Sequence, residues 1–145
     1  MVLRELTISY APVQGVVTRP QVTAPADAAR LLFSLLDAEP SEVFGVLLLN
    51  TKHRVLAWST VSRGSLDKTI VEPREVFRVA ILGNAAAIIL AHNHPSGDPT
   101  PSPNDHELTR RLMSGAALMG IDIADHVIVG NETEKYFSFK EAGCL

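Results

Sequence analysis

Hydrophobic and polar residues alternate at the start of the chain, and the spacing then becomes helical. The alternation predicts a strand over residues 2–10, whose apolar members are Leu6, Ile8 and Tyr10. Residues 11–24 are rich in Pro, Gly and Thr and predict a loop. From Pro25 apolar residues recur three and four positions apart, which predicts a helix that ends at Pro40 and Ser41. The apolar residues of this helix are Ala28, Leu31, Leu32, Leu35 and Leu36.

Two nearly continuous apolar runs predict buried strands. EVFGVLLLN occupies residues 42–50, and a shorter run occupies residues 86–91 between turn residues. Such runs are typical of central strands that are covered on both faces. Residues 55–61 follow the turn TKHR and predict a strand that pairs back on the first run as a hairpin. Residues 123–129 and 136–139 predict two further strands.

Two more helices are predicted, one on each side of the strand at residues 86–91. The first begins at Pro73 and ends at Gly83 and Asn84, and the second begins near Pro103. Their expected buried faces carry Val76, Phe77, Ala80 and Ile81 in the first, and Leu108, Leu112, Ala116 and Met119 in the second. Residues 63–72 form a polar connection. Because helices and strands interleave, we expect one α/β domain with a three-layer α-β-α arrangement around a mixed sheet.

Composition narrows the possible functions. A chain of 145 residues with 46% hydrophobic residues suits one domain with its own core. A single cysteine, Cys144, excludes an intrachain disulfide and a four-thiolate zinc site, which favours a cytoplasmic location. No apolar run is long enough to span a membrane. The net charge is −3 and the 13 Lys and Arg are scattered, so direct nucleic-acid binding is not expected.

The segment ILAHNHPSGDPTPSPND, residues 89–105, carries the candidate chemistry. His92 and His94 are two residues apart at a strand end, so their side chains lie on the same side of the chain. Asp105 follows eleven residues after His94. Zinc accepts nitrogen and oxygen ligands in a tetrahedral shell, and catalytic sites leave one position for water. His92, His94 and Asp105 are therefore candidate ligands of one zinc ion.

A structural interpretation of the same residues is also available. Ser102 is a preferred residue before a helix, Pro103 suits the first turn, and Asp105 can complete a capping box with Ser102. His92 and His94 could simply make hydrogen bonds in a turn after a strand. The two interpretations are compatible, because a capped helix start is a rigid way to present Asp105.

Hydrolysis by a metal-activated water would also need a base near the metal. Glu42 is the candidate, because a charge at the start of an apolar strand is otherwise poorly placed. Spacing alone does not separate it from three other glutamates, Glu39, Glu72 and Glu75. Ser102 could face a bound substrate.

The remaining polar residues of interest have simpler explanations. We expect His53 to belong to the hairpin turn and His106 to point away from the site, since adjacent helical residues do not share a face. His126 on a predicted strand suggests a structural hydrogen bond, and Asp98 is expected to face solvent. Cys144 has no nearby base in sequence and is not expected to be a nucleophile.

The residues together resemble the JAMM motif of JAB/MPN metalloproteases. That motif is a Glu, then His-x-His, seven residues, Ser, two residues and Asp, and it corresponds here to Glu42, His92-Asn93-His94, Ser102 and Asp105. The resemblance implies His92, His94 and Asp105 as zinc ligands and Glu42 as the acid/base. It implies that Ser102 stabilises an oxyanion. It also implies the JAB/MPN architecture, which is similar to that of cytidine deaminases.

The RadC-like branch is the closer match, through EVFGVLLLN, SRGSLDKTIVEPREVFRVAI, NAAAIILAHNHPSG, PSPND and DHVIVG. The JAB/MPN domain is expected over residues 24–145, after an N-terminal strand and loop at 1–23. Asn93 stands where deubiquitinating members usually carry Ser or Thr, which disfavours a ubiquitin-type substrate. RadC-like proteins usually have an N-terminal helix-hairpin-helix region, for which 1–23 is too short, so its DNA contacts are not carried over.

The function expected from this resemblance is zinc-dependent hydrolysis of an amide or isopeptide bond in a peptide or protein. The alternative is a DNA-repair-associated or non-catalytic protein-interaction module of the same fold, and a homodimer is possible. HNH endonucleases place their three motif residues far apart, so the letters at 92–94 do not indicate one. Zinc deaminases need H-x-E and P-C-x-x-C, which a single cysteine excludes.

Overall fold

A five-stranded mixed sheet lies between helices in the computed structural model, which describes residues 1–14, 19–64 and 71–145. The elements are α1 (Pro25–Leu36), β1 (Val43–Leu49), β2 (Val55–Arg63), α2 (Pro73–Leu82), β3 (Ala87–His94), α3 (Pro103–Met119), β4 (Asp122–Gly130) and β5 (Lys135–Ser138). The strand order is β2-β1-β3-β4-β5. β3 and β4 run parallel, and the other neighbouring strands are antiparallel.

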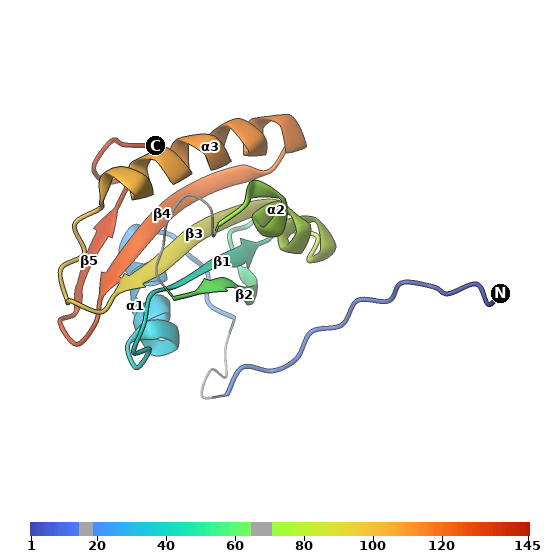
Figure 1. The fold of residues 1–145 in the computed structure, drawn as a ribbon, viewed down its shortest axis with the longest axis horizontal. Coiled ribbons are helices and arrows are strands. Elements are labelled where there is room, and N and C mark those ends of the chain that lie inside the picture. Colours follow the sequence, from blue (N-terminus) through green and yellow to red (C-terminus); the bar gives the residue numbers. More distant parts are fainter. Residues whose placement is uncertain (15–18, 65–70) are drawn as a thin grey trace.

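The sheet is covered on both faces, as the sequence predicted. α1 packs on one face, and α2 and α3 cover the other (Figure 1). Side-chain alternation along β1 divides the core accordingly: Leu47 and Leu49 pack with α1, whereas Phe44 and Leu48 pack with α2 and α3. The predicted three-layer α/β architecture is therefore confirmed.

β3 occupies the centre of the sheet, between β1 and β4. Its residues are buried as far as Asn93, with His94 half-buried. The apolar run predicted a strand that ends at Ala91, but the strand continues to His94 because β4 pairs with it as far as Gly130. The two histidines therefore lie within a central strand rather than in the loop after it.

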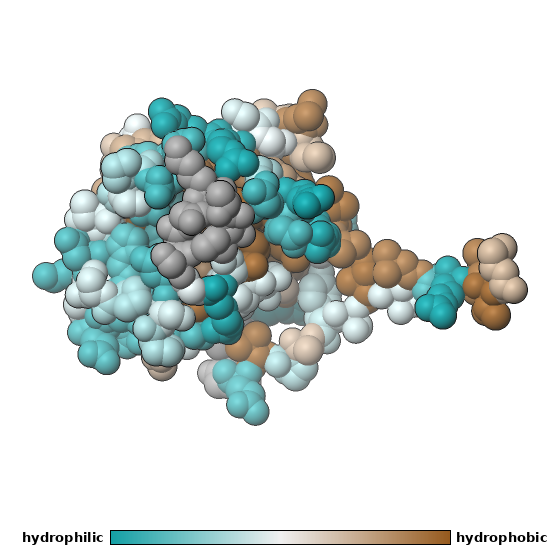
Figure 2. All heavy atoms as spheres, in the orientation of Figure 1, coloured by the Kyte–Doolittle hydropathy of each residue, from teal (hydrophilic) through white to brown (hydrophobic). Residues whose placement is uncertain are grey.

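The predicted strand over residues 2–10 is wrong. Residues 1–10, all of which the structure describes, contain no helix or strand. They extend away from the body of the molecule (Figures 1 and 2), and Leu3 and Leu6 are 96% and 78% exposed. Alternation is a local signal, whereas a strand needs a partner to accept its backbone hydrogen bonds. The chain reaches the fold at residues 8–10, which lie against β2 and α2, and the Tyr10 hydroxyl donates to the Gly83 carbonyl over 2.8 Å.

Two residues of the predicted buried helix faces are exposed. Ile81 is 56% exposed and Met119 is 51% exposed. Both lie in the last turn of their helices, so the packed stripe ends earlier than the apolar spacing suggests, at Ala80 in α2 and Ala116 in α3.

Parts of two predicted connections lie outside the described residues. They are 15–18 within the loop at 11–24, and 65–70 within the polar connection at 63–72. Among the described residues, no helix has the length and apolar character needed to cross a membrane.

Candidate metal centre

The two histidines of β3 and the first turn of α3 meet at one end of the sheet. His92 Nε2 lies 3.1 Å from His94 Nε2, 3.3 Å separates His92 Nε2 from Asp105 Oδ1, and 3.5 Å separates His94 Nε2 from Asp105 Oδ2. His92 and Asp105 are buried, while His94 is half-buried. The structure thus brings together the three residues that the sequence suggested as ligands, and this cluster could hold a metal ion.

The separations between these atoms are of the size found between ligand atoms of a tetrahedral zinc site, with His92 and His94 contacting different oxygens of Asp105. Ligand atoms about 2.0–2.1 Å from zinc at tetrahedral angles lie about 3.3 Å from one another. The contacts among His92, His94 and Asp105 span 3.1–3.5 Å. Two nitrogens and a carboxylate in this arrangement suit zinc, and a fourth corner would remain for water or substrate. The residues present therefore fit the metal that the motif implies.

A hydrogen-bond chain fixes which nitrogen of His92 faces the cluster. The hydroxyl of Thr109 donates to the Asp105 carbonyl over 2.7 Å, so its oxygen must accept from His126 Nδ1, also at 2.7 Å. Burial and the charge of His92 hold the pKa of His126 well below its usual value, so His126 is neutral and its Nε2 carries a lone pair. That lone pair accepts from His92 Nδ1 over 2.9 Å. The His92 Nε2 therefore faces the cluster, and it offers a lone pair there when the ring is neutral.

A backbone carbonyl fixes which nitrogen of His94 faces the cluster. His94 Nδ1 lies 2.7 Å from the carbonyl oxygen of Asp98, which can only accept. The ring therefore donates through Nδ1 and directs the Nε2 lone pair toward His92 and Asp105. When both rings are neutral, two lone pairs and a carboxylate converge, which is an arrangement that a cation stabilises.

Asp105 is held as an anion. Burial alone would raise its pKa, but hydrogen bonds with His92 and His94 hold the pKa of Asp105 well below its usual range. The pKa of His94 is raised: burial opposes this, but Asp105, the Asp98 carbonyl and the charge of Glu42 outweigh it. The amide at the start of α3 helps to hold the carboxylate, because the Ser102 N–H donates to Asp105 Oδ2 over 2.7 Å.

The predicted capping box is present alongside the metal cluster. Ser102 precedes α3, and its hydroxyl oxygen accepts from the Asp105 N–H over 3.2 Å. Since this bond uses the oxygen as an acceptor, the hydroxyl proton can be directed elsewhere. Ser102 is exposed, so a substrate can reach it. The structural and the chemical interpretations of this segment are therefore both compatible with the geometry.

Glu42 lies immediately before β1, on the face of the sheet that carries the cluster. Phe44, two residues later, is paired with His92 and stacks on its ring with centroids 5.9 Å apart. Side chains two apart share a face, so Glu42 is directed to the same side as His92 and His94. Its charge contributes to the raised pKa of His94. The half-buried Glu42 thus lies near the cluster without belonging to the ligand set.

Comparison with known proteins agrees with this geometry. The family model of the RadC-like JAB domain matches residues 22–144. The chain belongs to the RadC-like JAB domain family. The resemblance that the sequence suggested is therefore confirmed, and JAB-domain families include metalloproteases.

Curated relatives of this RadC-like chain are named only as UPF0758 proteins. That of Desulfitobacterium hafniense is 47% identical over 129 residues, which cover 89% of this chain and 56% of the relative. The relative from Rubrobacter xylanophilus is 47% identical, with 88% and 55% covered. That of Clostridium beijerinckii is 41% identical over the whole chain and 62% of the relative. The chain thus spans little more than half the length of such relatives.

Sequence reasoning missed several residues that support the RadC-like site. Thr109 sets the polarity of the His126 hydrogen bond, and the Asp98 carbonyl orients His94. A Cβ at Gly130 would collide with the backbone of Gly97, in the loop between His94 and Ser102, so only glycine allows this close approach. The expected structural role of His126 is confirmed by its hydrogen bond. No spacing rule points to Thr109 or Gly130.

The other polar residues considered in the sequence lie outside the candidate ligand set. His53 belongs to the β1–β2 turn, where its N–H donates to the Asn50 carbonyl. His106 packs beside Phe139, with ring centroids 5.0 Å apart, and is outside the ligand cluster. The Asp98 carboxylate caps Thr100, while its carbonyl serves His94.

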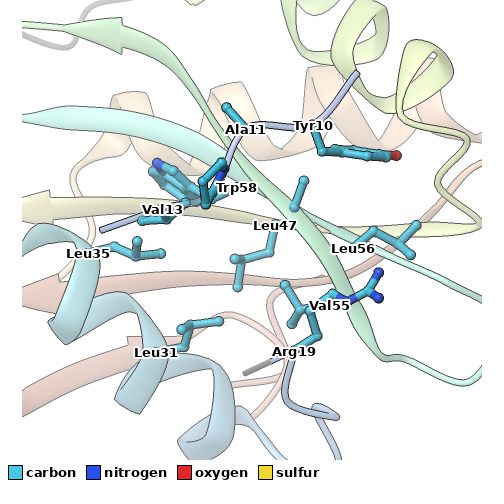
Figure 3. Close-up of a pocket in the computed structure, with 12 residues that line it drawn as sticks. Tyr10, Ala11, Val13, Arg19, Leu31, Leu35, Leu47, Val55, Leu56 and Trp58 are labelled. Atoms are coloured by element: carbon cyan, nitrogen blue, oxygen red, sulfur yellow. The ribbon is translucent and has the colours of Figure 1, made fainter. Parts of the chain in front are cut away.

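A hollow lies away from the candidate ligand cluster. It is a cavity of about 260 Å³ between the N-terminal segment, α1 and β2 (Figure 3). Leu31 and Leu35 reach it from α1, and Val55 and Trp58 reach it from β2. The lining is mainly apolar and contains no residue of the ligand set. The candidate ligand cluster and this cavity are therefore separate features of the fold.

Proposed function

We propose that this RadC-like domain is a zinc-dependent hydrolase of the JAMM type that cleaves an amide or isopeptide bond. The observation that carries the proposal is the convergence of the His92 and His94 Nε2 lone pairs on Asp105, with Glu42 beside them. Zinc at this position would polarise a carbonyl and lower the pKa of a bound water to about 7.

The chain supplies a base at a suitable place for this chemistry. Glu42 is half-buried, close enough to the cluster for its charge to act on His94, and outside the ligand set. In the proposed reaction its carboxylate takes a proton from the attacking water and passes it to the leaving nitrogen. Proximity to the cluster favours Glu42 over Glu39 and Glu75, whose carboxylates lie at Arg63 and Arg78.

Ser102 is proposed to stabilise the oxyanion. Its hydroxyl oxygen is oriented by the Asp105 N–H, and its proton can then be donated toward the carbonyl oxygen of a substrate. The residue is exposed at the start of α3, beside a buried ligand. The site is therefore arranged with its ligands inside and its proposed substrate-binding groups at the surface.

A peptide or protein is the proposed substrate class. A net charge of −3 with cations scattered along the sequence gives no indication of the basic surface on which phosphate contacts depend. The alternative is a non-catalytic protein-interaction module, in which the same cluster would be structural. Hydrolysis of any peptide or isopeptide substrate that depends on bound zinc separates these two functions.

The first experiment is metal analysis of the purified protein by inductively coupled plasma mass spectrometry. We expect about one zinc per chain. His94→Ala should lose it, whereas His53→Ala, which alters a histidine of the β1–β2 turn, should retain it. Screening of a fluorogenic peptide library with and without chelator would follow. Failure of the wild-type protein to take up zinc would reject the proposal.

A further inference from the structure

The pairing of β1 with β3 ends beside the metal cluster, and a side chain continues it. The last register pair is Phe44 with His92. One step further, the Val43 N–H donates to the side-chain Oδ1 of Asn93, with 2.7 Å between the atoms. Asn93 lies between the two histidine ligands in sequence, so the strand that carries the ligands also holds the start of β1.

The Asn93 side-chain amide also holds the residue that precedes Glu42. Asn93 Nδ2 donates to the Ser41 carbonyl over 3.1 Å. Ser41 and Val43 flank Glu42 directly, so one side chain fixes the backbone before and after it. Both bonds use the Asn93 amide, which therefore sets the position of the Glu42 Cα relative to β3.

Asn131 supports Asn93 from behind. Its Oδ1 accepts from Asn93 Nδ2 over 3.0 Å, which fixes the orientation of the Asn93 amide. Its own Nδ2 donates to carbonyls at the end of α1, those of Asp37 and Glu39 at 3.0 Å each and that of Leu36 at 3.3 Å. The two asparagines thus connect the ends of α1, β1, β3 and β4 in one hydrogen-bonded group.

Burial makes this group rigid. Asn93 is fully buried and Asn131 is 7% exposed. A buried amide that loses a partner leaves unpaired polar atoms, which is costly, so the group is held in one arrangement. Among the described residues, no buried side-chain nitrogen or oxygen lacks a hydrogen-bond partner. Asn93 and Asn131 therefore hold the Ser41–Val43 backbone from the β3 side, while the Gly64 N–H donates to the Glu42 carbonyl over 2.8 Å from the β2 side.

Because side chains alternate along β3, Asn93 lies on the face of the sheet opposite to the candidate ligands. Asn93 is directed to the α1 face of the sheet, because His92 and His94 are directed to the α3 face. Glu42 is directed to the α3 face, as Phe44 is. We propose that Asn93, supported by Asn131, is a positioning residue that holds Glu42 beside the metal cluster from the opposite face of the sheet. This inference rests on the proposed function.

The proposal predicts that loss of the Asn93 side chain displaces Glu42 but leaves metal binding intact. None of the hydrogen bonds of the Asn93 side chain involves His92, His94 or Asp105. Asn93→Ala should therefore keep zinc, with a change in Kd of less than about threefold. A displacement of about 1 Å at a reacting group can lower the rate about 10²-fold, so kcat should fall by up to that factor while KM changes little.

A matched control exists at the other end of β1. Asn50 is also an asparagine that holds backbone by its side chain, because its Oδ1 accepts from the Lys52 and Arg54 N–H groups in the β1–β2 turn. Asn50→Ala removes a comparable set of bonds far from the cluster. A general loss of stability would affect both variants, whereas the proposed positioning role affects only Asn93→Ala.

The test uses spectroscopy together with activity. In the ¹³C-labelled wild-type chain, zinc should shift the Glu42 carboxylate resonance. The shift should shrink at least twofold in Asn93→Ala and persist in Asn50→Ala. The Val43 amide should exchange with deuterium at least tenfold faster in Asn93→Ala, with amides of Leu90 and Ala91 unchanged. If Asn93→Ala does not fold, the same measurements are made on Asn93→Ser. The small serine hydroxyl can hydrogen-bond to a water molecule in the space left by the amide.

The outcomes separate this inference from the proposed function. A wild-type protein that takes up no zinc rejects the proposed function, and the positioning role with it. Zinc uptake together with an undiminished Glu42 shift in Asn93→Ala overturns the role of Asn93 alone. Where hydrolysis is measured, Asn93→Ala should have no further effect in a Glu42→Gln background. An equal effect in both backgrounds would also overturn the proposal.

Discussion

His126 accepts a hydrogen bond from His92 across two neighbouring parallel strands, with 2.9 Å between His126 Nε2 and His92 Nδ1. The direction of that bond follows from Thr109, whose single hydroxyl proton is already donated to the Asp105 carbonyl. Two of the candidate ligands, His92 and Asp105, are thus connected by a route that does not pass through the metal position. Metal affinity should depend on this connection as well as on the ligands.

His126→Phe should weaken zinc binding about 10–100-fold without abolishing it, since loss of a partner that orients a ligand typically has this effect. The ring volume is nearly kept, and the stacking on Phe139 (centroids 4.6 Å apart) is preserved. Competition with a chromophoric chelator measures the Kd. His106→Phe is the control, because His106 also packs on Phe139 but lies outside the ligand cluster. Equal affinities in both variants would contradict a role for His126.

Glu42→Ala should keep one zinc per chain and lose hydrolysis by about 10²–10⁴-fold, the usual contribution of a general base. The expectation follows from its position beside the cluster and outside the ligand set. Zinc content and kcat are measured on the same preparation. Glu75→Ala, which removes a surface partner of Arg78, should match the wild type in both. Activity of Glu42→Ala equal to that of the wild type would remove Glu42 from the mechanism.

Zinc should stabilise the folded chain by mass action. At a free concentration of about 100 times Kd the gain is about 2.7 kcal/mol. For a chain of this length that corresponds to a rise in Tm of roughly 5–11 °C. Differential scanning calorimetry with zinc and with chelator measures the shift, and His94→Ala should show none. A zinc-dependent rise of the same size in His94→Ala would mean that the stabilising ion binds elsewhere.

Gly130→Ala should destabilise the fold and weaken zinc binding together. The added methyl would meet the Gly97 backbone, and this loop also presents the Asp98 carbonyl that orients His94. We expect a loss of about 1–3 kcal/mol, as for other overpacking changes, measured by urea unfolding of the metal-free protein. Gly143→Ala is the control: its φ of 69° strains an added side chain, but no atom lies within 4 Å. An unchanged Kd in Gly130→Ala would separate the loop from the site.

Asp27, in the first turn of α1, should make the free energy of unfolding depend on pH in the acid range. Hydrogen bonds from the Thr23 hydroxyl and the Thr23 and Ala24 N–H groups lower the pKa of Asp27 below its ordinary 3.8. A lowered folded-state pKa means that the stabilisation is present above the unfolded pKa and disappears as pH falls through the folded pKa. The free energy of unfolding of the wild type should therefore exceed that of Asp27→Ala by the full amount at pH 7. This difference should shrink below about pH 4. A constant difference would contradict it.

The sequence predicted most of the fold because its signals were local. Prolines mark the starts of α1 and α2, a glycine marks the end of α2, and apolar runs mark β1 and β3, whereas α1 ends at Leu36, before the predicted Pro40. The meeting of His92, His94 and Asp105 was also predictable, since His92 and His94 share a strand face. By contrast, Thr109 and Asn131 act through partners far along the chain, and residue types alone do not specify such pairings. The N-terminal alternation failed for the same reason, because it lacked a partner strand.

The candidate ligands occupy a short stretch of the chain, from the end of β3 to the first turn of α3, whereas Glu42 reaches them only through the pairing of β1 with β3. Closing the loop between His94 and Asp105 costs little chain entropy, and bringing β1 alongside costs more. During folding, the ion-binding half can therefore assemble before the half that carries the proposed base. A substitution that weakens only the pairing of β1 with β3 would then leave the candidate ligands together without the proposed base beside them.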